Sequence, residues 1–274
     1  MDKHQGRLRM SPDMRNQVAV ARQAATSCAI DETALPWVGW TLTEFEGPFA
    51  QPIDIAETFL ADERLASWGR TKRQLKRSDL FLMAARLPAT VSPKEALTFA
   101  VNVNAWGFGT TGYGYSRTER IFDRGDPQAG SKAAEAIRIL RSEGPVEAYF
   151  FLYNKSGNDS GATGHVRNWG PAFFTKFLYF ADPGNQPTAE PGRPTALVLD
   201  QFLAQAVNAI VPSQPMGEFA TNGWTTPQYA FYLSLLRRLA RSASTPTSDV
   251  SAGMIEAALF SHFAGRVHIP PARS

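Results

Sequence analysis

The stretch NWGPAFFTKFLYFA, residues 168–181, decides the fold of this chain. A Trp-Gly-Pro turn signal leads directly into an aromatic segment of helical length, and Lys176 is the only charged residue of that segment. In one interpretation the lysine stem lies along apolar surface and its ammonium reaches water. In the other, aromatic neighbours partly desolvate the amine, which lowers its pKa and raises the fraction of neutral, nucleophilic lysine. The residues alone leave both interpretations open.

A second stretch, TALVLDQFLAQAV at residues 195–207, follows a segment rich in proline and glycine. Its apolar run ends at Asp200, where a helical pattern begins. An aspartate at this position accepts hydrogen bonds from the free amides of the first helical turn. The position also suits a functional carboxylate that faces a nucleophile, because the helix dipole favours negative charge there.

Together these stretches resemble the helix-hairpin-helix Gly/Pro-Asp superfamily of DNA glycosylases, and more narrowly the bacterial family of 8-oxoguanine DNA glycosylase-like proteins. The motifs cover residues 168–207. The resemblance implies an all-α, helix-hairpin-helix fold with the hairpin and catalytic region at residues 145–210. It also implies that Lys176 is the nucleophile and Asp200 the essential carboxylate. The hairpin departs from the usual Gly-x-Gly pattern, because it carries Gly170-Pro171-Ala172.

Further site residues follow from the same resemblance. In glycosylases that take 8-oxoguanine, a helix after the aspartate supplies a glutamine and, one turn later, an aromatic residue to the base pocket; packing in the core is the alternative for such an aromatic. A stretch of glycines and aromatics at residues 106–117 forms either a structural loop or a wall of that pocket. The residues expected to bind the base are Gln228, Tyr232, Trp106 and Phe180, and those expected to bind DNA are Trp169, Gly170, Thr175 and Arg117.

Apolar residues recur at helical spacing over most of the chain, which favours one all-α domain over residues 1–274, with two helical lobes around a central cleft. We expect helices at residues 12–30, 53–68, 131–142 and 254–263. The Ser-Pro-Lys-Glu sequence at residues 92–95 has the residues that begin a helix. The basic cluster at residues 70–77 is expected either on a solvated helix face or at a DNA backbone.

Composition narrows the function classes. The net charge of +3 is compatible with nucleic-acid binding but does not require it. A single cysteine excludes an internal disulfide, and no run of about 20 apolar residues predicts a membrane helix. With no secretory signal in the first 30 residues, we expect a cytoplasmic protein. We find no spaced Cys/His set for zinc, and the expected chemistry needs neither a metal nor an organic cofactor.

Three hypotheses for function remain. In the first, a base-excision-repair enzyme excises 8-oxoguanine from DNA through a lysine Schiff base and nicks the strand as an AP lyase. In the second, which the resemblance also implies because similar proteins occur in bacterial antiphage gene clusters, the chain binds a modified guanine of the deazaguanine type, free or attached to a protein, without cutting DNA. In the third, it is a helical interaction protein.

Overall fold

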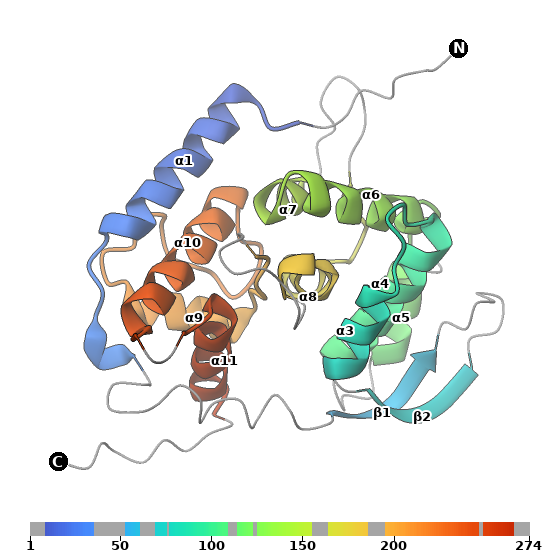
Figure 1. The fold of residues 1–274 in the computed structure, drawn as a ribbon. Helices are drawn as coiled ribbons and strands as arrows, with labels where there is room; N and C mark the ends of the chain where they lie inside the picture. The colour runs from blue at the N-terminus through green and yellow to red at the C-terminus, as the bar shows by residue number, and fades with distance from the viewer. Residues whose placement is uncertain are drawn as a thin grey trace. The chain divides into compact units, whose positions relative to one another are not determined.

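The computed structural model describes residues 9–35, 53–60, 69–75, 77–108, 114–122, 125–154, 164–185, 195–246 and 249–265; for residues 53–60, 69–75 and 114–116 only the backbone is described. The fold is all-α in class, with one two-stranded sheet (Figure 1). The chain divides into two compact units. Unit 1 comprises Met1–Met10 and Pro52–Ala196, and unit 2 comprises Ser11–Gln51 and Leu197–Ser274.

Unit 1 contains most of the helices. They are α3 (Arg77–Ala85), α4 (Pro93–Phe108), α5 (Gly114–Phe122), α6 (Ala129–Ser142), α7 (Pro145–Tyr153) and α8 (Pro171–Ala181), followed by the 3₁₀ helix η3 (Pro183–Asn185). The helix expected at residues 131–142 is confirmed as α6. The predicted start of α4 is also confirmed, because Glu95 accepts hydrogen bonds from the amide and hydroxyl of Ser92 at 2.8 and 2.7 Å.

The core of unit 1 forms where α4 packs against α6 and α8. Gly130 of α6 marks the close approach of the first pair, since a Cβ there would lie 2.5 Å from the carbonyl oxygen of Pro93. On the α8 side, Phe99 meets Phe177 with ring centroids 5.6 Å apart. Both phenylalanines are almost fully buried, so aromatic packing fixes α8 against α4.

The helix expected at residues 53–68 is wrong. Ile53–Leu60 form strand β1, which pairs antiparallel with β2, Gly69–Leu75 (Figure 1). Ile53 is opposite Leu75 and Leu60 is opposite Gly69, with a register shift between Ile55 and Thr58. An irregularity of this kind adds a residue to one strand and interrupts the period-two alternation that identifies strands. The basic residues at 70–75 therefore lie on a strand, not on a helix face.

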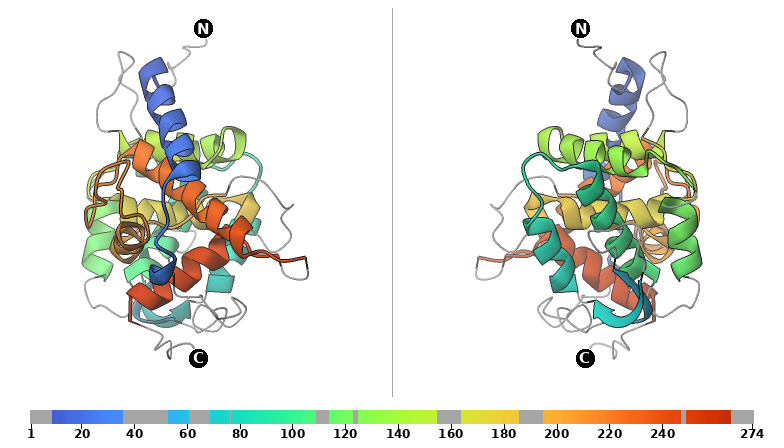
Figure 2. Two further views of the ribbon diagram at one scale, coloured as in Figure 1. Left: turned by 90° about the vertical axis from the view of Figure 1, so that its left-hand side faces the viewer. Right: turned by 90° about the vertical axis from the view of Figure 1, so that its right-hand side faces the viewer.

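Unit 2 is built from α1 (Pro12–Ser27), the 3₁₀ helix η1 (Glu32–Ala34), α9 (Gln201–Ile210), α10 (Thr226–Ala243) and α11 (Ala252–Phe263). Helix α1 runs beside α10 (Figure 2). Arg238 of α10 ties the two together, because its guanidinium donates to the carbonyl oxygens of Ala25 and Cys28 at 3.3 and 2.7 Å. The helices expected at residues 12–30 and 254–263 are thus present, the second from residue 252.

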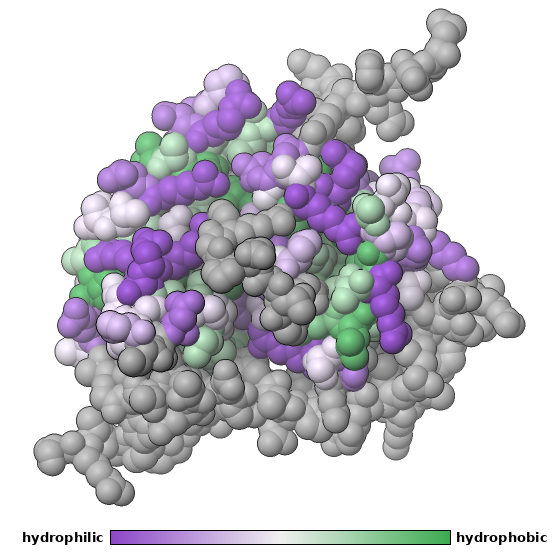
Figure 3. Space-filling view, in the orientation of Figure 1, coloured by the Kyte–Doolittle hydropathy of each residue, from purple (hydrophilic) through white to green (hydrophobic). Residues whose placement is uncertain are grey.

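The visible surface is mixed in polarity. In Figure 3 apolar residues gather over α3, where Leu82 is 57% exposed. Among the described helices, none combines the length and the apolar composition needed to cross a membrane.

Candidate active site

Lys176 lies on the least buried face of α8. Its Nζ donates to the carbonyl oxygen of Ala172 at 2.7 Å and lies 5.5 Å from the centroid of the Phe173 ring. The neighbouring positions Thr175 and Phe177 are buried, whereas Lys176 itself is half-buried. The lysine stem thus runs along its own helix towards the N-terminal end, with the amine over an aromatic ring. Both interpretations made from the sequence stay predictions.

Trp106 and Phe180 are brought together, as the sequence led us to expect for two base-binding residues. Their rings meet edge to face with centroids 5.1 Å apart. Phe180 is fully buried and also packs edge to face on Phe81 at 5.0 Å. The indole nitrogen of Trp106 is buried without a hydrogen-bond partner in the described part of the chain. In this structure Phe180 therefore acts as core, and base binding by the pair stays a prediction.

Arg77 extends this aromatic group in a way that no sequence motif indicated. Its guanidinium lies 4.6 Å from the centroid of the Tyr179 ring and 5.9 Å from that of Phe81, and it donates to the Tyr179 hydroxyl. The sequence showed Arg77 only as the last residue of a basic cluster. The cation instead stacks on the aromatic surface of α3 and α8.

The turn before α8 is held by burial of Trp169. This side chain is 3% exposed and meets Phe122, Phe174 and Phe177 edge to face. Thr175 is also buried and donates to the carbonyl oxygen of Pro171 at 2.7 Å. Both residues therefore pack within unit 1, and DNA contact by their side chains stays a prediction.

Gly170 and Arg117 are the more accessible of the residues expected at DNA. Gly170 is the N-cap of α8, its carbonyl accepts the amides of Phe173 and Phe174 at 2.9 and 3.0 Å, and a Cβ there would meet no atom within 4 Å. Arg117 is exposed on α5, with its guanidinium 5.8 Å from the Phe108 ring centroid. The loop expected at residues 106–117 is only partly correct, because 106–108 end α4 and 114–117 begin α5. Residues 109–113 lie outside the described residues.

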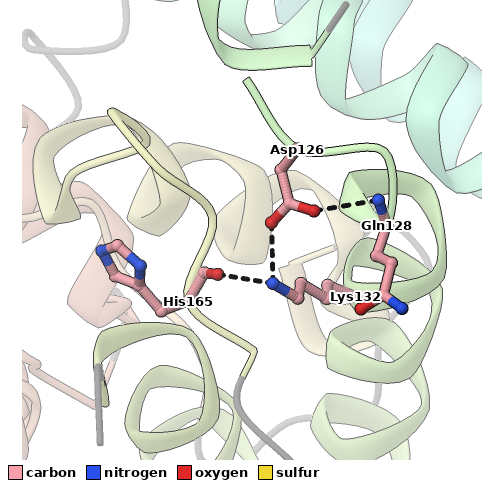
Figure 4. Close-up of polar contacts among 4 residues, drawn as sticks. All are labelled: Asp126, Gln128, Lys132 and His165. Carbon is pink, nitrogen blue, oxygen red and sulfur yellow. Dashed lines mark hydrogen bonds and ion pairs between the residues drawn. The ribbon is translucent and has the colours of Figure 1, made fainter. Parts of the chain in front are cut away.

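Lys132 links α6 to the turn that leads into α8 (Figure 4). Its Nζ lies 2.7 Å from Asp126 Oδ2 and donates to the His165 carbonyl oxygen at 2.8 Å. Asp126 Oδ1 also accepts the Gln128 amide at 2.9 Å. The Lys132 and Asp126 side chains are only 16% and 14% exposed. This largely buried ion pair therefore holds the backbone at His165, in the turn before α8, through the bond to its carbonyl oxygen.

The C-terminal end of α8 is fixed by two polar side chains. Asp182 is fully buried and accepts the amides of Gly184 at 2.9 Å and Ala196 at 2.7 Å. Asn185 donates to the carbonyl oxygens of Tyr179 and Ala196 at 2.9 and 2.7 Å. The backbone four residues before Asp200 is thereby bonded to the end of the helix that carries Lys176.

Asp200 is the N-cap of α9, as predicted. Its Oδ1 accepts the amides of Phe202 and Leu203 at 3.0 and 3.2 Å, and the residue is 8% exposed. These bonds satisfy amides that an α-helix leaves unpaired at its start. The carboxylate is therefore fixed by its own helix and buried within unit 2.

Three buried side chains of α10 and α11 hold the segment that leads to Asp200. Glu256 accepts the Val198 amide at 2.6 Å, and the Tyr232 hydroxyl donates to the Val198 carbonyl oxygen at 2.6 Å. The Tyr229 hydroxyl accepts the Leu197 amide at 3.3 Å and donates to the Leu197 carbonyl oxygen at 3.0 Å. Burial raises the pKa of Tyr232 well above its ordinary value of 10.0, and the nearby carboxylates of Glu256 and Asp200 add to the effect. The sequence did not indicate a role for Glu256.

Gln228 completes a capping box at the start of α10. Its Oε1 accepts the Thr225 amide at 2.9 Å, and its Nε2 donates to the carbonyl oxygens of Met216 and Glu218 at 3.4 and 3.3 Å. The expected pair, Gln228 and Tyr232, does lie on one helix, but both side chains make internal hydrogen bonds. Their contact with a base stays a prediction.

The chemistry available is that of one amine and one carboxylate. Lys176 belongs to unit 1 and Asp200 to unit 2. An amine can attack a sugar or carbonyl carbon and form a Schiff base. A carboxylate can stabilise positive charge that develops in a reaction. That these two residues act together stays a prediction.

A family model described as "Putative 8-oxoguanine DNA glycosylase OGG-like protein" matches residues 50–260, which is most of the chain. No curated protein and no solved structure gives a significant match. The matched range includes α8 with Lys176 and the N-cap Asp200. The chain therefore belongs to the OGG-like family of 8-oxoguanine DNA glycosylase-like proteins.

Proposed function

We propose that the protein is a DNA glycosylase with AP lyase activity that excises 8-oxoguanine through a Schiff base on Lys176. The observation that carries the proposal is the setting of that amine. Its Nζ is held at 2.7 Å from the Ala172 carbonyl oxygen on a helix whose other faces are buried, inside a chain of the OGG-like family. A nucleophilic lysine needs this combination of fixed geometry and access to substrate.

The proposed reaction begins when the oxidised guanine is turned out of the duplex. Neutral Lys176 forms an Nζ–C1′ bond as the C1′–N9 bond breaks, and the electron pair of the broken bond leaves with the base. Asp200 stabilises the positive charge that develops on the sugar. A proton from Nζ passes to the departing base. The C1′–O4′ bond of the sugar then breaks, O4′ takes up a proton from water, and Nζ and C1′ form an iminium. Loss of a C2′ proton to water expels the 3′ phosphate as the C3′–O bond breaks, and the strand is nicked. The steps balance without an oxidant or a reductant.

In this proposal the surrounding residues position the two reacting groups. Lys132 and Trp169 hold the turn before α8, and Asp182 holds the end of the helix. Glu256 and Tyr232 hold the segment that precedes Asp200. A small misplacement of a reacting group slows a reaction strongly. We therefore expect these buried contacts to affect the reaction rate as well as the stability of the fold.

Borohydride trapping tests the proposal. The protein is incubated with a duplex that carries one 8-oxoguanine, reduced with borohydride, and separated on a denaturing gel, with Lys176→Gln and Asp200→Asn in parallel. We expect a covalent protein–DNA adduct with the wild type, none with Lys176→Gln, and slower formation with Asp200→Asn. An undamaged duplex controls for unspecific reduction.

A second candidate is binding of a modified guanine without strand cleavage. The small net charge of +3 favours it, because proteins that grip DNA phosphates commonly present a strongly basic face. The burial of Trp169 and Thr175, two residues expected to bind DNA, points the same way. If 8-oxoguanine and abasic duplexes both stay intact and unbound, calorimetric titration with free deazaguanine-type bases tests this candidate.

A further inference from the structure

Gly107 and Lys176 lie in close contact within unit 1. Gly107 is the penultimate residue of α4, and a Cβ built on it would lie 3.1 Å from Cδ of Lys176. The same Cβ would lie 3.3 Å from two ring carbons of Phe173. The backbone of α4 therefore passes directly against the lysine stem and against the ring over which the amine lies.

Steric contact, and not backbone conformation, favours glycine at residue 107. Gly107 does not have a positive φ, so an alanine could adopt its backbone conformation. Alanine is also the better helix former, by about 1 kcal/mol. Local helix stability therefore favours alanine at residue 107, and the close approach of Lys176 and Phe173 opposes it.

Neither neighbour can move away without loss. Phe173 packs on Phe108 with ring centroids 4.3 Å apart, so a shift of its ring would disturb that contact. The lysine stem ends in the bond from Nζ to the Ala172 carbonyl oxygen at 2.7 Å. The flexible lysine side chain, with four methylenes, carries about 2 kcal/mol of rotamer entropy. The α4 backbone on one side of the stem therefore reduces the number of rotamers that Lys176 can adopt.

We propose that Gly107 is a positioning residue for Lys176: the bare backbone of α4 lets the lysine stem lie flat, and it sets the place of the nucleophilic nitrogen. The inference rests on the proposed function for its catalytic consequence. A methyl group at residue 107 pushes Cδ by a few tenths of an ångström and displaces the amine at the end of the stem further. Since a misplacement of about 1 Å can cost about 100-fold in rate, we expect Gly107→Ala to slow adduct formation at least about tenfold.

The test compares Gly107→Ala with two matched variants. Gly253→Ala lies in α11, where the nearest atom to the new Cβ is 3.7 Å away, an ordinary van der Waals distance, so it adds the same methyl group without a close contact. Gly130→Ala brings its Cβ to 2.5 Å from the Pro93 carbonyl oxygen, so it should lower the melting temperature. We expect Gly107→Ala to melt close to the wild type, as Gly253→Ala does, because the gain in helix stability of about 1 kcal/mol offsets the small shifts of Lys176 and Phe173. An unchanged melting temperature separates an effect on positioning from an effect on folding.

Two further measurements make the readout specific. The affinity for an uncleavable 8-oxoguanine duplex should stay within about twofold of the wild type, while the single-turnover rate of adduct formation falls. Separately, reductive methylation with formaldehyde and cyanoborohydride, read by peptide mass spectrometry, reports on the Lys176 amine without DNA. We expect Lys176 to be methylated faster in Gly107→Ala, because Nζ leaves the Ala172 carbonyl, with the exposed Lys94 as internal standard.

The outcomes separate the two claims. If the wild type forms no adduct, the proposed function fails, and the methylation rate of Lys176 still decides the role of Gly107. If Gly107→Ala traps DNA and is methylated at wild-type rates, the inference is overturned. Should that variant not fold, the double variant Gly107→Ala, Phe173→Leu relieves the contact on the ring side. The double variant must still form the trapped DNA adduct more slowly than Phe173→Leu alone, because the contact between residue 107 and the Lys176 stem remains.

Discussion

The carboxylate of Asp182 accepts the amide of Ala196 at 2.7 Å in the interior of unit 1. The two residues stand at either end of the Pro/Gly-rich segment that separates the two predicted catalytic stretches. Through this bond the last turn of α8 is fixed to the chain just before Asp200. This contact fixes Ala196, the second residue of the later stretch, within unit 1.

We predict that Asp182→Ala lowers the free energy of unfolding by about 2–4 kcal/mol, since the buried Ala196 amide and the partly buried Gly184 amide lose their acceptor. Asp182→Asn keeps one acceptor oxygen and should fall between this variant and the wild type. Urea unfolding measures both. Asp13→Ala removes an exposed aspartate bonded to Gln17 and serves as the control. An Asp182→Ala variant as stable as Asp13→Ala would contradict the closing role of Asp182.

Lys132→Met should destabilise unit 1 and disorder the turn before α8. Methionine keeps the apolar stem but leaves Asp126 and the His165 carbonyl oxygen without the ammonium, and removing one partner of a largely buried ion pair costs about 3 kcal/mol. Amide hydrogen exchange at residues 164–170 measures the turn. Lys94→Met, at an exposed lysine, should change neither quantity. Unchanged protection of the turn would show that Lys132 does not anchor it.

The raised pKa of Tyr232 predicts a specific loss of stability in alkali. The folded protein holds this hydroxyl protonated at pH values where the unfolded chain ionises it, above its ordinary pKa of 10.0. Its contribution is thus complete below pH 10 and declines as pH rises towards the folded pKa. The stability difference between the wild type and Tyr232→Phe should therefore shrink above pH 10. Tyr153→Phe, at a half-buried tyrosine, is the comparison. A constant difference up to pH 11 would contradict the prediction.

Glu95 predicts a change at the acid end. Hydrogen bonds from the hydroxyl and then the amide of Ser92 hold its pKa below the ordinary 4.5. The hydrogen bonds between Ser92 and Glu95 therefore stabilise the start of α4 fully above pH 4.5, and this contribution is lost as pH falls through the lower folded pKa. The stability gap between the wild type and Glu95→Gln should close between pH 4.5 and 2. Glu32→Gln, at another exposed helix start, is measured alongside to show the effect of removing one surface charge.

The helices near the predicted site could be read from the sequence because each has a local signal. Pro171 begins α8 and Asp200 caps α9, and both signals act through amides within one turn. The capping residues of α4 act in the same way. The prediction of a helix at the position of strand β1 was wrong, because the irregularity between Ile55 and Thr58 breaks the alternation that would have indicated a strand. The start of helix α5 was not predicted, because its glycine and aromatic residues also suit a loop.

The supporting contacts could not be predicted, because they join residues far apart in the sequence. Glu256 meets Val198 across 58 positions, and Arg77 meets Tyr179 across 102. The sequence placed Gly107 in the stretch of glycines and aromatics at residues 106–117, which does not identify its neighbour. Only the packing of α4 on α8 shows that this neighbour is Lys176.

The most direct test of the central claim is to identify the residue that bonds to DNA. An adduct trapped with borohydride on an 8-oxoguanine duplex is digested with nuclease and protease, and the modified peptide is sequenced by tandem mass spectrometry. We predict a reduced sugar remnant on Lys176 alone, within the peptide that spans α8. A remnant on any other lysine, or an adduct that persists in Lys176→Gln, would contradict it.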